Sequence, residues 1–306
     1  MAAATNWDAD EIPDQAGRVV IVTGSTSGLG EETARVLAAK NAKVVMAVRN
    51  TAKGEEVAAK IRTGIPNATI VVSELDLSSL ESTKKFAAAF LGDHDRLDLL
   101  INNAGVMFPP YTRTKDDWEL TMATNHLCPF ALTLLLLPLL RSTPSSRVVT
   151  VSSAAHTSGK IDMDDINWTT RPYKSMQAYS DSKIANLHFT VELARRIAEG
   201  GGEGPMAVAA HPGWTRTDLQ RHNWFVRFLN NVFSQGVDMG ALPTLRAAID
   251  PEAKPGNYFG PQPNWYGAEF TGYPVLVKSN ERSKDVEIAK QLWDKSEALT
   301  GVKYSA

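Results

Sequence analysis

Short apolar runs alternate with stretches of helix-forming residues along the first two thirds of this chain of 306 residues. A continuous apolar strand is buried on both faces, which happens where helices cover both sides of a parallel sheet. Right-handed crossovers between such strands give a doubly wound α/β sheet, whose ligand crevice lies beyond the carboxyl ends of the strands. We expect strands at 18–22, 43–48, 69–75, 97–102, 147–152 and 207–211.

The remaining regular segments predict helices between these strands and after them. The expected helices are 31–40, 51–62, 79–91, 115–140, 176–199, 237–249 and 281–299. Hydrophobic residues make up 43% of the chain, enough to bury a substantial core, which favours one large domain over two small ones. We therefore expect a short tail over 1–16 and a single domain over 17–306.

Aromatic residues gather in the last third of the chain, where the regular alternation loosens. We expect the C-terminal extension, 218–280, to fold over the crevice as a substrate lid with an apolar lining. A subunit contact or a satellite core accounts for the same residues equally well. The aromatic residues are Trp224, Phe225, Phe228, Phe233, Trp265, Tyr266, Phe270 and Tyr273.

Charge and cysteine content narrow the range of partners. The chain has 32 basic and 34 acidic residues and a net charge of -2, which does not favour nucleic acid or an anionic membrane surface and leaves small molecules as the expected partners. Cys128 is the only cysteine, so an internal disulfide is excluded, and we expect a reducing, cytoplasmic setting. The N-terminus lacks the pattern of a signal peptide. The apolar run Cys128 to Leu140 is shorter than the ~20 residues of a membrane span, so it predicts a buried helix and no transmembrane segment.

A glycine-rich turn, TGSTSGLG at 23–30, follows the first expected strand and opens the first expected helix. Glycines at 24, 28 and 30 let the backbone turn tightly and approach a pyrophosphate, whose charge is favoured at a helix N-terminus. The spacing is G-x-x-x-G-x-G, and its position between strand and helix predicts a dinucleotide-binding turn.

Tyr179 and Lys183 are four residues apart in the stretch AYSDSKIAN. On a helix this spacing puts both side chains on one face, about 40° and about 6 Å apart. An ammonium favours the phenolate, so we expect Lys183 to lower the pKa of Tyr179 from its reference near ~10 and to make the phenol an efficient proton donor. Such a pair alone is more often a solvated polar face, and the remaining motifs make catalysis the better interpretation.

These two motifs occur in order with NNAG at 102–105, VSS at 151–153 and Pro212-Gly213. The chain thereby resembles the short-chain dehydrogenase/reductase family over residues 17–218. NHLCPF at 125–130, HPGWTRTDL and the tail over 258–301 look most like the retinol dehydrogenase and protochlorophyllide reductase-like branch. The resemblance implies a single-domain Rossmann-like sheet that binds a nicotinamide cofactor.

The resemblance also implies a catalytic set of Asn125, Ser153, Tyr179 and Lys183. Tyr179 would protonate a carbonyl oxygen as hydride arrives, or deprotonate an alcohol in the reverse direction, and Ser153, in preference to Ser152, would hydrogen-bond that oxygen. Lys183 would bind the nicotinamide ribose. Asn125 would hold a water that relays protons; alternatively, it only satisfies a helix kink.

Ser153 and Tyr179 are separated by more residues than in the short members of the family. The additional residues, HTSGKIDMDDINWTTRPYKSM at 156–176, are expected to loop out, as they do in the retinol dehydrogenase-like branch.

Cofactor choice depends on the end of the second strand, where Val48 and Arg49 stand at the place of the acid of NAD enzymes. Arg49 can pair with a 2′-phosphate, which favours NADP(H). The alternative is that Arg49 only solvates the helix start, since Ser27 stands where some NADP-dependent relatives have a second basic residue. The cofactor residues implied are Gly24, Ser27, Gly28, Leu29, Gly30, Arg49, Asp76, Leu77, Asn103, Ala104, Gly105, Tyr179, Lys183, Pro212, Gly213, Thr215 and Thr217.

Metal chemistry is not expected, because the six histidines lack metal-ligand spacing. Asp162, Asp164 and Asp165 are interpreted as a solvated turn in preference to a cation site.

We therefore predict an NADP(H)-dependent oxidoreductase that moves hydride between nicotinamide and the carbonyl or alcohol of a bulky hydrophobic substrate. A cofactor-sensing regulator without chemistry and a nucleotide-sugar epimerase-like enzyme are the alternatives. The intact Ser153, Tyr179 and Lys183 argue against the former, and the glycine spacing argues against the latter. A homodimer would pair through 115–140 and 176–199, unless the C-terminal tail covers those faces and leaves a monomer.

Overall fold

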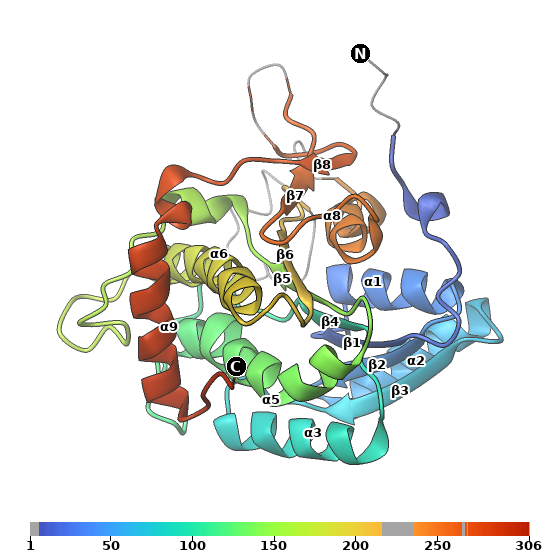
Figure 1. Cartoon of the computed structure of the whole chain (residues 1–306), viewed down its shortest axis with the longest axis horizontal. Helices are drawn as coiled ribbons and strands as arrows, with labels where there is room; N and C mark the ends of the chain where they lie inside the picture. The colour runs from blue at the N-terminus through green and yellow to red at the C-terminus, as the bar shows by residue number, and fades with distance from the viewer. Residues whose placement is uncertain (1–5, 216–234, 265–266, 268, 306) are drawn as a thin grey trace.

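The computed structural model describes residues 6–215, 235–264, 267 and 269–305 (Figure 1). Its strands are β1 (Val19–Thr23), β2 (Lys43–Val48), β3 (Thr69–Glu74), β4 (Leu99–Asn102), β5 (Arg147–Val151), β6 (Met206–Ala210), β7 (Tyr258–Pro261) and β8 (Pro274–Leu276). They form an eight-stranded sheet in the order β3-β2-β1-β4-β5-β6-β7-β8. The order reverses between β1 and β4, and this switch point is where a doubly wound sheet opens its ligand crevice.

The first six strands confirm the six predicted strands, with ends shifted by one or two residues. β7 and β8 were not predicted. Both are short, and they contain Gly260 and prolines at or near their ends, a composition that favours turns over strands. β7 forms because β6 offers a parallel partner, and β8 pairs antiparallel with β7, so the sheet departs from the expected parallel order at its last strand.

Helices cover both faces of the sheet (Figure 1). The helices are α1 (Gly28–Ala39), α2 (Thr51–Gly64), α3 (Leu80–Asp93), α4 (Leu120–Met122), α5 (Cys128–Ser142), α6 (Ser175–Glu199), α8 (Val237–Ile249) and α9 (Val286–Thr300). Alternate residues of each strand point to opposite faces: Val20 and Val22 pack with α1, α2 and α8, whereas Val19 and Ile21 pack with α3, α5, α6 and α9. The result is the predicted Rossmann-like, three-layered fold.

Two helix starts differ from the sequence analysis. α1 begins at Gly28 and not at residue 31. Its first turn contains Gly28 and Gly30, and because glycine is a poor helix former, the sequence did not predict this turn as helical. α9 begins at Val286 after a separate 3-10 turn, η5 (Glu281–Lys284), since Asp285 caps it by accepting from the main-chain amides of Glu287 and Ile288.

The predicted helix 115–140 begins later, at Leu120, where the buried carboxylate of Glu119 accepts from the amides of Thr121 and Met122. It continues through a π-helical turn, η2 (Ala123–Leu127), into α5. The segment Leu120–Ser142 has 23 residues, and its most apolar window has a mean hydropathy of 1.6, so by length and composition it could cross a membrane, and the expected absence of a transmembrane segment stays a prediction. However, 78% of the most apolar window of this segment is buried inside the protein, as is expected of a core helix.

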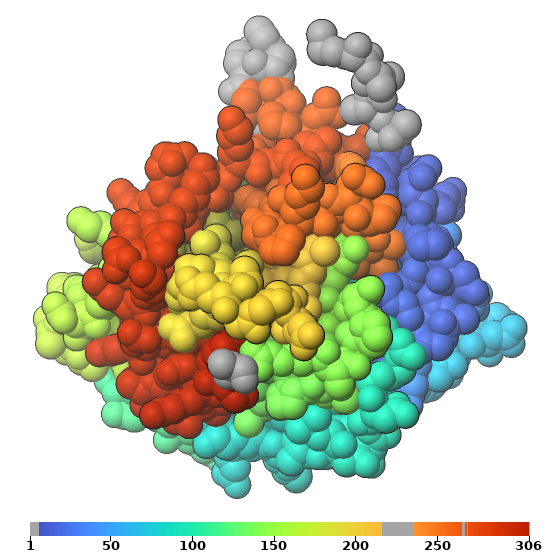
Figure 2. Space-filling view, viewed as in Figure 1, coloured from blue at the N-terminus to red at the C-terminus, as the bar shows by residue number. Residues whose placement is uncertain are grey.

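The two ends of the chain pack onto this framework. Trp7 and Ile12, within the predicted tail, are buried in the cluster beneath α1 and α8. At the other end α9 lies against α6, as Figure 2 shows, and Trp293 contacts Phe130 of α5 and Phe189 of α6. α9 thus covers part of the helical face through which a dimer was expected to pair, and the subunit count stays a prediction.

The segment 218–280 contributes to the sheet and its helical cover. α8 packs on α1, and β7 and β8 extend the sheet, so these parts belong to the framework. Residues 216–234 lie outside the described residues. The substrate-covering role of the connecting segments stays a prediction.

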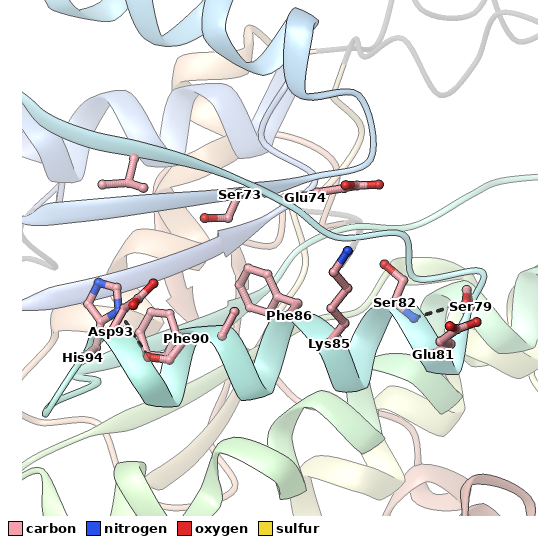
Figure 3. Close-up of a pocket in the computed structure, with 12 residues that line it drawn as sticks. Ser73, Glu74, Ser79, Glu81, Ser82, Lys85, Phe86, Phe90, Asp93 and His94 are labelled. Carbon is pink, nitrogen blue, oxygen red and sulfur yellow. Dashed lines mark hydrogen bonds between the residues drawn. The ribbon is translucent and has the colours of Figure 1, made fainter.

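A groove runs along the free edge of the sheet between β3 and α3 (Figure 3). Phe86 and Phe90 form its apolar floor, and the ring of His94 stacks on Phe90 with centroids 4.2 Å apart. The groove contains none of the predicted site residues. It therefore has no part in the chemistry expected at the carboxyl ends of the central strands.

Candidate active site

A cleft of about 500 Å³ lies at the carboxyl ends of the central strands, at the switch point between β1 and β4. The predicted residues that line it are Gly24, Ser27, Gly28, Leu29, Gly30, Arg49, Asp76, Leu77, Asn103, Ala104, Gly105, Tyr179, Lys183 and Pro212. The fold thus brings the glycine turn and the Tyr179/Lys183 pair to one cavity, although they are more than a hundred residues apart in sequence.

Two glycines of the turn are required by close packing. Gly24 has a φ of +68°, and a Cβ there would lie 2.8 Å from the Cα of Ala104. A Cβ on Gly30 would lie 2.4 Å from the carbonyl oxygen of Gly24 and 2.5 Å from Nδ2 of Asn103. The turn and the NNAG loop therefore interlock at the floor of the cleft.

Thr23 joins the same two loops. Its hydroxyl accepts hydrogen bonds from the main-chain amides of Asn103 and Ala104 at 3.1 and 3.0 Å, and its carbonyl accepts from the Asn103 side chain at 2.8 Å. These bonds hold the NNAG loop against the end of β1. A surface preorganised in this way can accept a flat ligand without first being ordered.

Tyr179 lies on α6 with only 8% of its surface exposed. Burial raises the pKa of the Tyr179 phenol, and a hydrogen bond with Ser153 opposes this in part. The prediction that Lys183 lowers this pKa was wrong for the structure described here, because desolvation of the phenol dominates. The Lys183 Nζ atom lies 5.6 Å from the centroid of the Tyr179 ring.

Lys183 is itself buried. Its ammonium donates to the main-chain oxygen of Val151 at 3.0 Å, an atom that also accepts from Nδ2 of Asn186 at 3.1 Å. Burial lowers the pKa of Lys183 to about 8, because a desolvated ammonium is penalised. The amine therefore titrates near neutral pH, within reach of proton exchange.

The two serines after β5 differ in their partners. The Ser152 hydroxyl donates to the main-chain oxygen of Lys183 at 2.8 Å, which ties the strand end to α6. The Ser153 hydroxyl accepts from the amide of Ala155 as the cap of η3 (Ala154–Ser158), and its interaction with the phenol partly opposes the rise in the pKa of Tyr179. Ser152 lines the cleft and Ser153 does not, so the choice of Ser153 and its catalytic role stay a prediction.

Asn125 lies in the π-helical turn and does not line the cleft. Its side-chain oxygen accepts from the amide of Val106 at 2.7 Å, and its Nδ2 donates to the Val106 carbonyl at 3.0 Å and to the Ser182 hydroxyl at 2.9 Å. These partners are protein groups in the loop after β4 and on α6, and not the backbone of its own helix, which the helix-kink alternative would require. The water-holding role stays a prediction.

Two predicted cofactor residues, Gly213 and Thr215, do not line the cleft. Gly213 and Thr215 are in the turn after β6, where a Cβ on Gly213 would lie 2.4 Å from the carbonyl of Phe270 and the Thr215 hydroxyl donates to the Pro212 carbonyl at 2.8 Å. Thr217 lies outside the described residues. Pro212 lines the cleft, whereas Gly213 and Thr215 do not, and Gly213 is packed against the C-terminal segment.

The cleft also contains residues that the sequence analysis missed, among them Thr26, Asn50 and Lys53. Asn50 caps α2 by accepting from the amide of Lys53 at 3.0 Å. Lys53 lies in the first turn of α2 and Arg49 just before its N-cap, and both cations line the cleft. The i, i+4 spacing after a strand end was the available signal.

Of the predicted aromatic residues, Phe270 and Tyr273 lie within the described residues. Phe270 is 42% exposed and meets the Trp214 ring edge-on at 6.2 Å, next to the Pro212-Gly213 turn. Tyr273 packs on the core cluster beneath α1 and α8, as the satellite-core alternative expects.

The acidic residues of the insertion form a structured turn. Among the described residues, no three His, Cys, Asp or Glu side chains lie together in a way that could hold a metal ion. Asp165 is buried, contrary to the solvated turn expected, and its carboxylate accepts from the amides and hydroxyls of Thr169 and Thr170.

Comparison with known proteins agrees with this geometry. Residues 18–224 match the family model for short chain dehydrogenases. The chain is 39% identical to retinol dehydrogenase 12 of Mus musculus, over 94% of this chain and 88% of that protein, and 38% identical to retinol dehydrogenase 13 of Homo sapiens, over 94% and 85%.

Solved structures give the same result. A crystal structure of an uncharacterized protein from Mycobacterium Paratuberculosis is 41% identical, with a TM-score of 0.83 over 99% of this chain and all of that one. The Pseudomonas aeruginosa RhlG/NADP active-site complex, at 24% identity, shares the fold, with a TM-score of 0.64 over 79% of this chain and 94% of that one. The chain belongs to the short-chain dehydrogenase family and is retinol dehydrogenase-like.

Proposed function

We propose that this protein is an NADP(H)-dependent oxidoreductase acting on the carbonyl or alcohol of a bulky hydrophobic substrate. Membership of the dehydrogenase family supports the reaction class. The observation that carries the proposal is that a buried phenol, followed by Lys183 on the same helix, lines the same cleft as the glycine turn.

The residues of the cleft suit a nicotinamide dinucleotide. The glycine turn lines the cleft at the N-terminus of α1, where a pyrophosphate would be favoured, and Asp76 and Leu77, which also line the cleft, would flank the adenine. When bound, the cofactor supplies or accepts the hydride. Every other requirement of the reaction falls on the protein's own side chains.

In the reducing direction, Tyr179 gives its hydroxyl proton to the substrate oxygen as the carbonyl carbon gains hydride, and an alcohol results. Ser153 hydrogen-bonds the same oxygen, so two hydroxyls polarise the carbonyl. Lys183, with its pKa lowered to about 8, can return a proton to the phenol after the transfer. The reverse sequence oxidises the alcohol.

Two cations support NADP(H) over NAD(H). Arg49 is exposed at the end of β2, and Lys53 lines the same wall one turn into α2. No acid stands at Val48 or Arg49 to bind a ribose hydroxyl or repel a phosphate. A 2′-phosphate there would gain charge-assisted hydrogen bonds.

A hydrophobic substrate is supported by exposed apolar side chains on two elements that border the cleft, α6 and the segment packed on the Pro212-Gly213 turn. Met176, one turn before Tyr179 on α6, is 66% exposed, and Phe270 is 42% exposed. Exposed apolar groups beside a cleft mark a ligand surface more often than a free one. The relatives' name makes retinal a sensible first substrate.

The test is NADPH oxidation, followed by absorbance, with retinal, aromatic aldehydes and long-chain aldehydes. Activity should fall by about 100-fold or more in Tyr179→Phe, the usual scale of a lost acid, and persist in the control Tyr304→Phe. Cofactor binding without turnover would instead support the sensing regulator. Redox-neutral conversion of a nucleotide sugar would support the epimerase.

A further inference from the structure

The segment between η3 and α6, which the sequence analysis expected only to loop out, has an ordered internal structure. Asp165 closes a turn by accepting four hydrogen bonds from Thr169 and Thr170. The guanidinium carbon of Arg171 lies 3.7 Å from the centroid of the Trp168 ring, a cation–π contact. Figure 1 shows this segment in yellow-green, projecting at the left of α6.

The segment between η3 and α6 contacts and supports the loop that follows β4. The Tyr173 hydroxyl donates to the buried carboxylate of Glu119 at 3.0 Å and lies 3.4 Å from the Pro109 carbonyl. The Tyr111 ring lies 5.1 Å from the Tyr173 ring, and its hydroxyl donates to the Asn167 carbonyl at 3.2 Å. The insertion thus holds residues 109–111 from outside.

Between these anchors, Phe108 has an unfavourable backbone. Its φ is +58°, in the left-handed region that bulky residues avoid, and the following Pro109 would ordinarily push it to extended backbone. Such an outlier persists only where its surroundings hold it. Here the clamp of Asn125 on Val106 holds one side and Tyr173 holds the other.

This backbone conformation places the Phe108 ring next to Tyr179. It meets the Tyr179 ring edge-on, with centroids 5.3 Å apart and planes at 76°. Phe108 is half-buried and does not line the cleft assigned to the cofactor, although Tyr179 and Val106 do. Its partly exposed surface therefore lies beside the phenol and outside the cleft assigned to the cofactor.

Resting on the function proposed above, we propose that Phe108 is a specificity-determining residue. Its ring forms an apolar wall at the phenol that favours carbonyl compounds whose carbonyl carries a flat, unsaturated group. A flat group can pack face or edge against Phe108 while its oxygen reaches Tyr179. A puckered saturated ring of equal size makes that contact less well.

The matched pair benzaldehyde and cyclohexanecarbaldehyde tests the proposal, because the two differ in flatness and little in size. We expect Phe108→Ala to lower the ratio of their kcat/KM values by about three- to tenfold, the usual value of an aromatic contact. The control Leu91→Ala, a partly exposed residue of α3, should leave the ratio unchanged. A change of less than about twofold in Phe108→Ala overturns the proposal.

Phe108→Gly protects the test against misfolding. Glycine adopts a φ of +58° without strain, so this variant removes the ring and relieves the backbone together. It should show the same change of selectivity as Phe108→Ala, with the affinity for NADPH unchanged. Loss of NADPH affinity in both variants would mean that the loop supports the cofactor, and the specificity role would be rejected.

Binding to the NADP⁺-loaded protein separates this proposal from the proposed function. NADP⁺ cannot reduce an aldehyde, so ligand-observed NMR measures affinity without turnover. If the wild-type protein reduces neither these two aldehydes nor any other aldehyde of the panel, the proposed function fails. Phe108 is still supported if benzaldehyde binds better than cyclohexanecarbaldehyde only when its ring is present, and it is rejected otherwise.

Tyr173 is the positioning residue in this arrangement, and a double variant tests it. Tyr173→Phe removes the bonds to Glu119 and Pro109, so it should lower the selectivity ratio in the wild-type background. In Phe108→Ala it should have no further effect on the ratio, since there is no ring left to place. Equal effects in both backgrounds would show that Tyr173 acts independently of Phe108.

Discussion

The ammonium of Lys183 donates to the main-chain oxygen of Val151, the last residue of β5, at a distance of 3.0 Å. The bond links the helix that carries the phenol to the strand that precedes Ser153. It also keeps a desolvated cation beside the cleft, with a pKa lowered to about 8. Function and stability therefore make opposite demands on this lysine.

Lys183→Met should stabilise the protein at neutral pH and reduce its activity. Between pH 8 and 10.5 the unfolded chain binds more protons at this site than the folded one, so wild-type stability gains from Lys183 as pH rises through this window. The variant lacks that rise, which amounts to about 3 kcal/mol at most. Urea unfolding without added cofactor at pH 7 and pH 10 measures it. Lys84→Met, an exposed control, should match the wild type, and a less stable Lys183→Met at pH 7 would contradict the argument.

The shifted pKa of Asp181 changes stability with pH in the opposite direction to that of Lys183. Its Oδ1 accepts from the amide of Lys160 and from Gln177, both at 2.7 Å, while Oδ2 is buried without a partner, and burial raises the pKa of the carboxyl to about 6. Asp162 adds to the rise and Arg171 opposes it. Between pH 3.8 and 6 the folded protein binds more protons, so stability falls as pH rises.

Asp181→Asn removes this loss. Relative to the wild type, the variant should be more stable at pH 7.5 than at pH 4.5 by about 2 kcal/mol, whatever the fixed cost of the new amide. Thermal or urea unfolding at both pH values gives the difference. The exposed control Asp164→Asn should show none, and an equal offset of Asp181→Asn at both pH values would rule out a shifted carboxyl.

Gly30→Ala should disrupt the glycine turn. The added methyl would lie 2.4 Å from the Gly24 carbonyl, so the turn must move, at a cost of about 1–3 kcal/mol. NADPH affinity, measured by fluorescence titration, should fall with stability. Gly64→Ala is the matched control, because its Cβ would meet nothing within 4 Å. A Gly30→Ala protein with normal stability would mean that the packing tolerates the methyl.

Arg49→Ala should change cofactor preference. Loss of a charge-assisted contact to the 2′-phosphate should raise the KM for NADPH on the order of tenfold, with little effect on NADH. Arg62→Ala, at the far end of α2, serves as the control. If the KM values for NADPH and NADH rise equally, Arg49 only solvates the helix start, as the alternative interpretation holds.

The amino-acid sequence by itself determined the strand and helix order up to β6, the glycine turn and the Tyr179/Lys183 pair. Apolar runs, helix-forming stretches and spacings within a few residues are local properties, and they persist whatever surrounds them. The meeting of Gly30 and Tyr179 at one cleft followed from topology, since parallel strands bring their carboxyl ends to one edge.

Tertiary structure decided the rest, because it depends on contacts between distant residues. β7 and β8 exist through pairing with β6 and with each other, against their own turn-like composition. The rise in the pKa of Tyr179 comes from burial by the whole fold, which no i, i+4 spacing records. The strained Phe108 is held by Asn125 and Tyr173, and its place at the phenol could be found only once those three segments met.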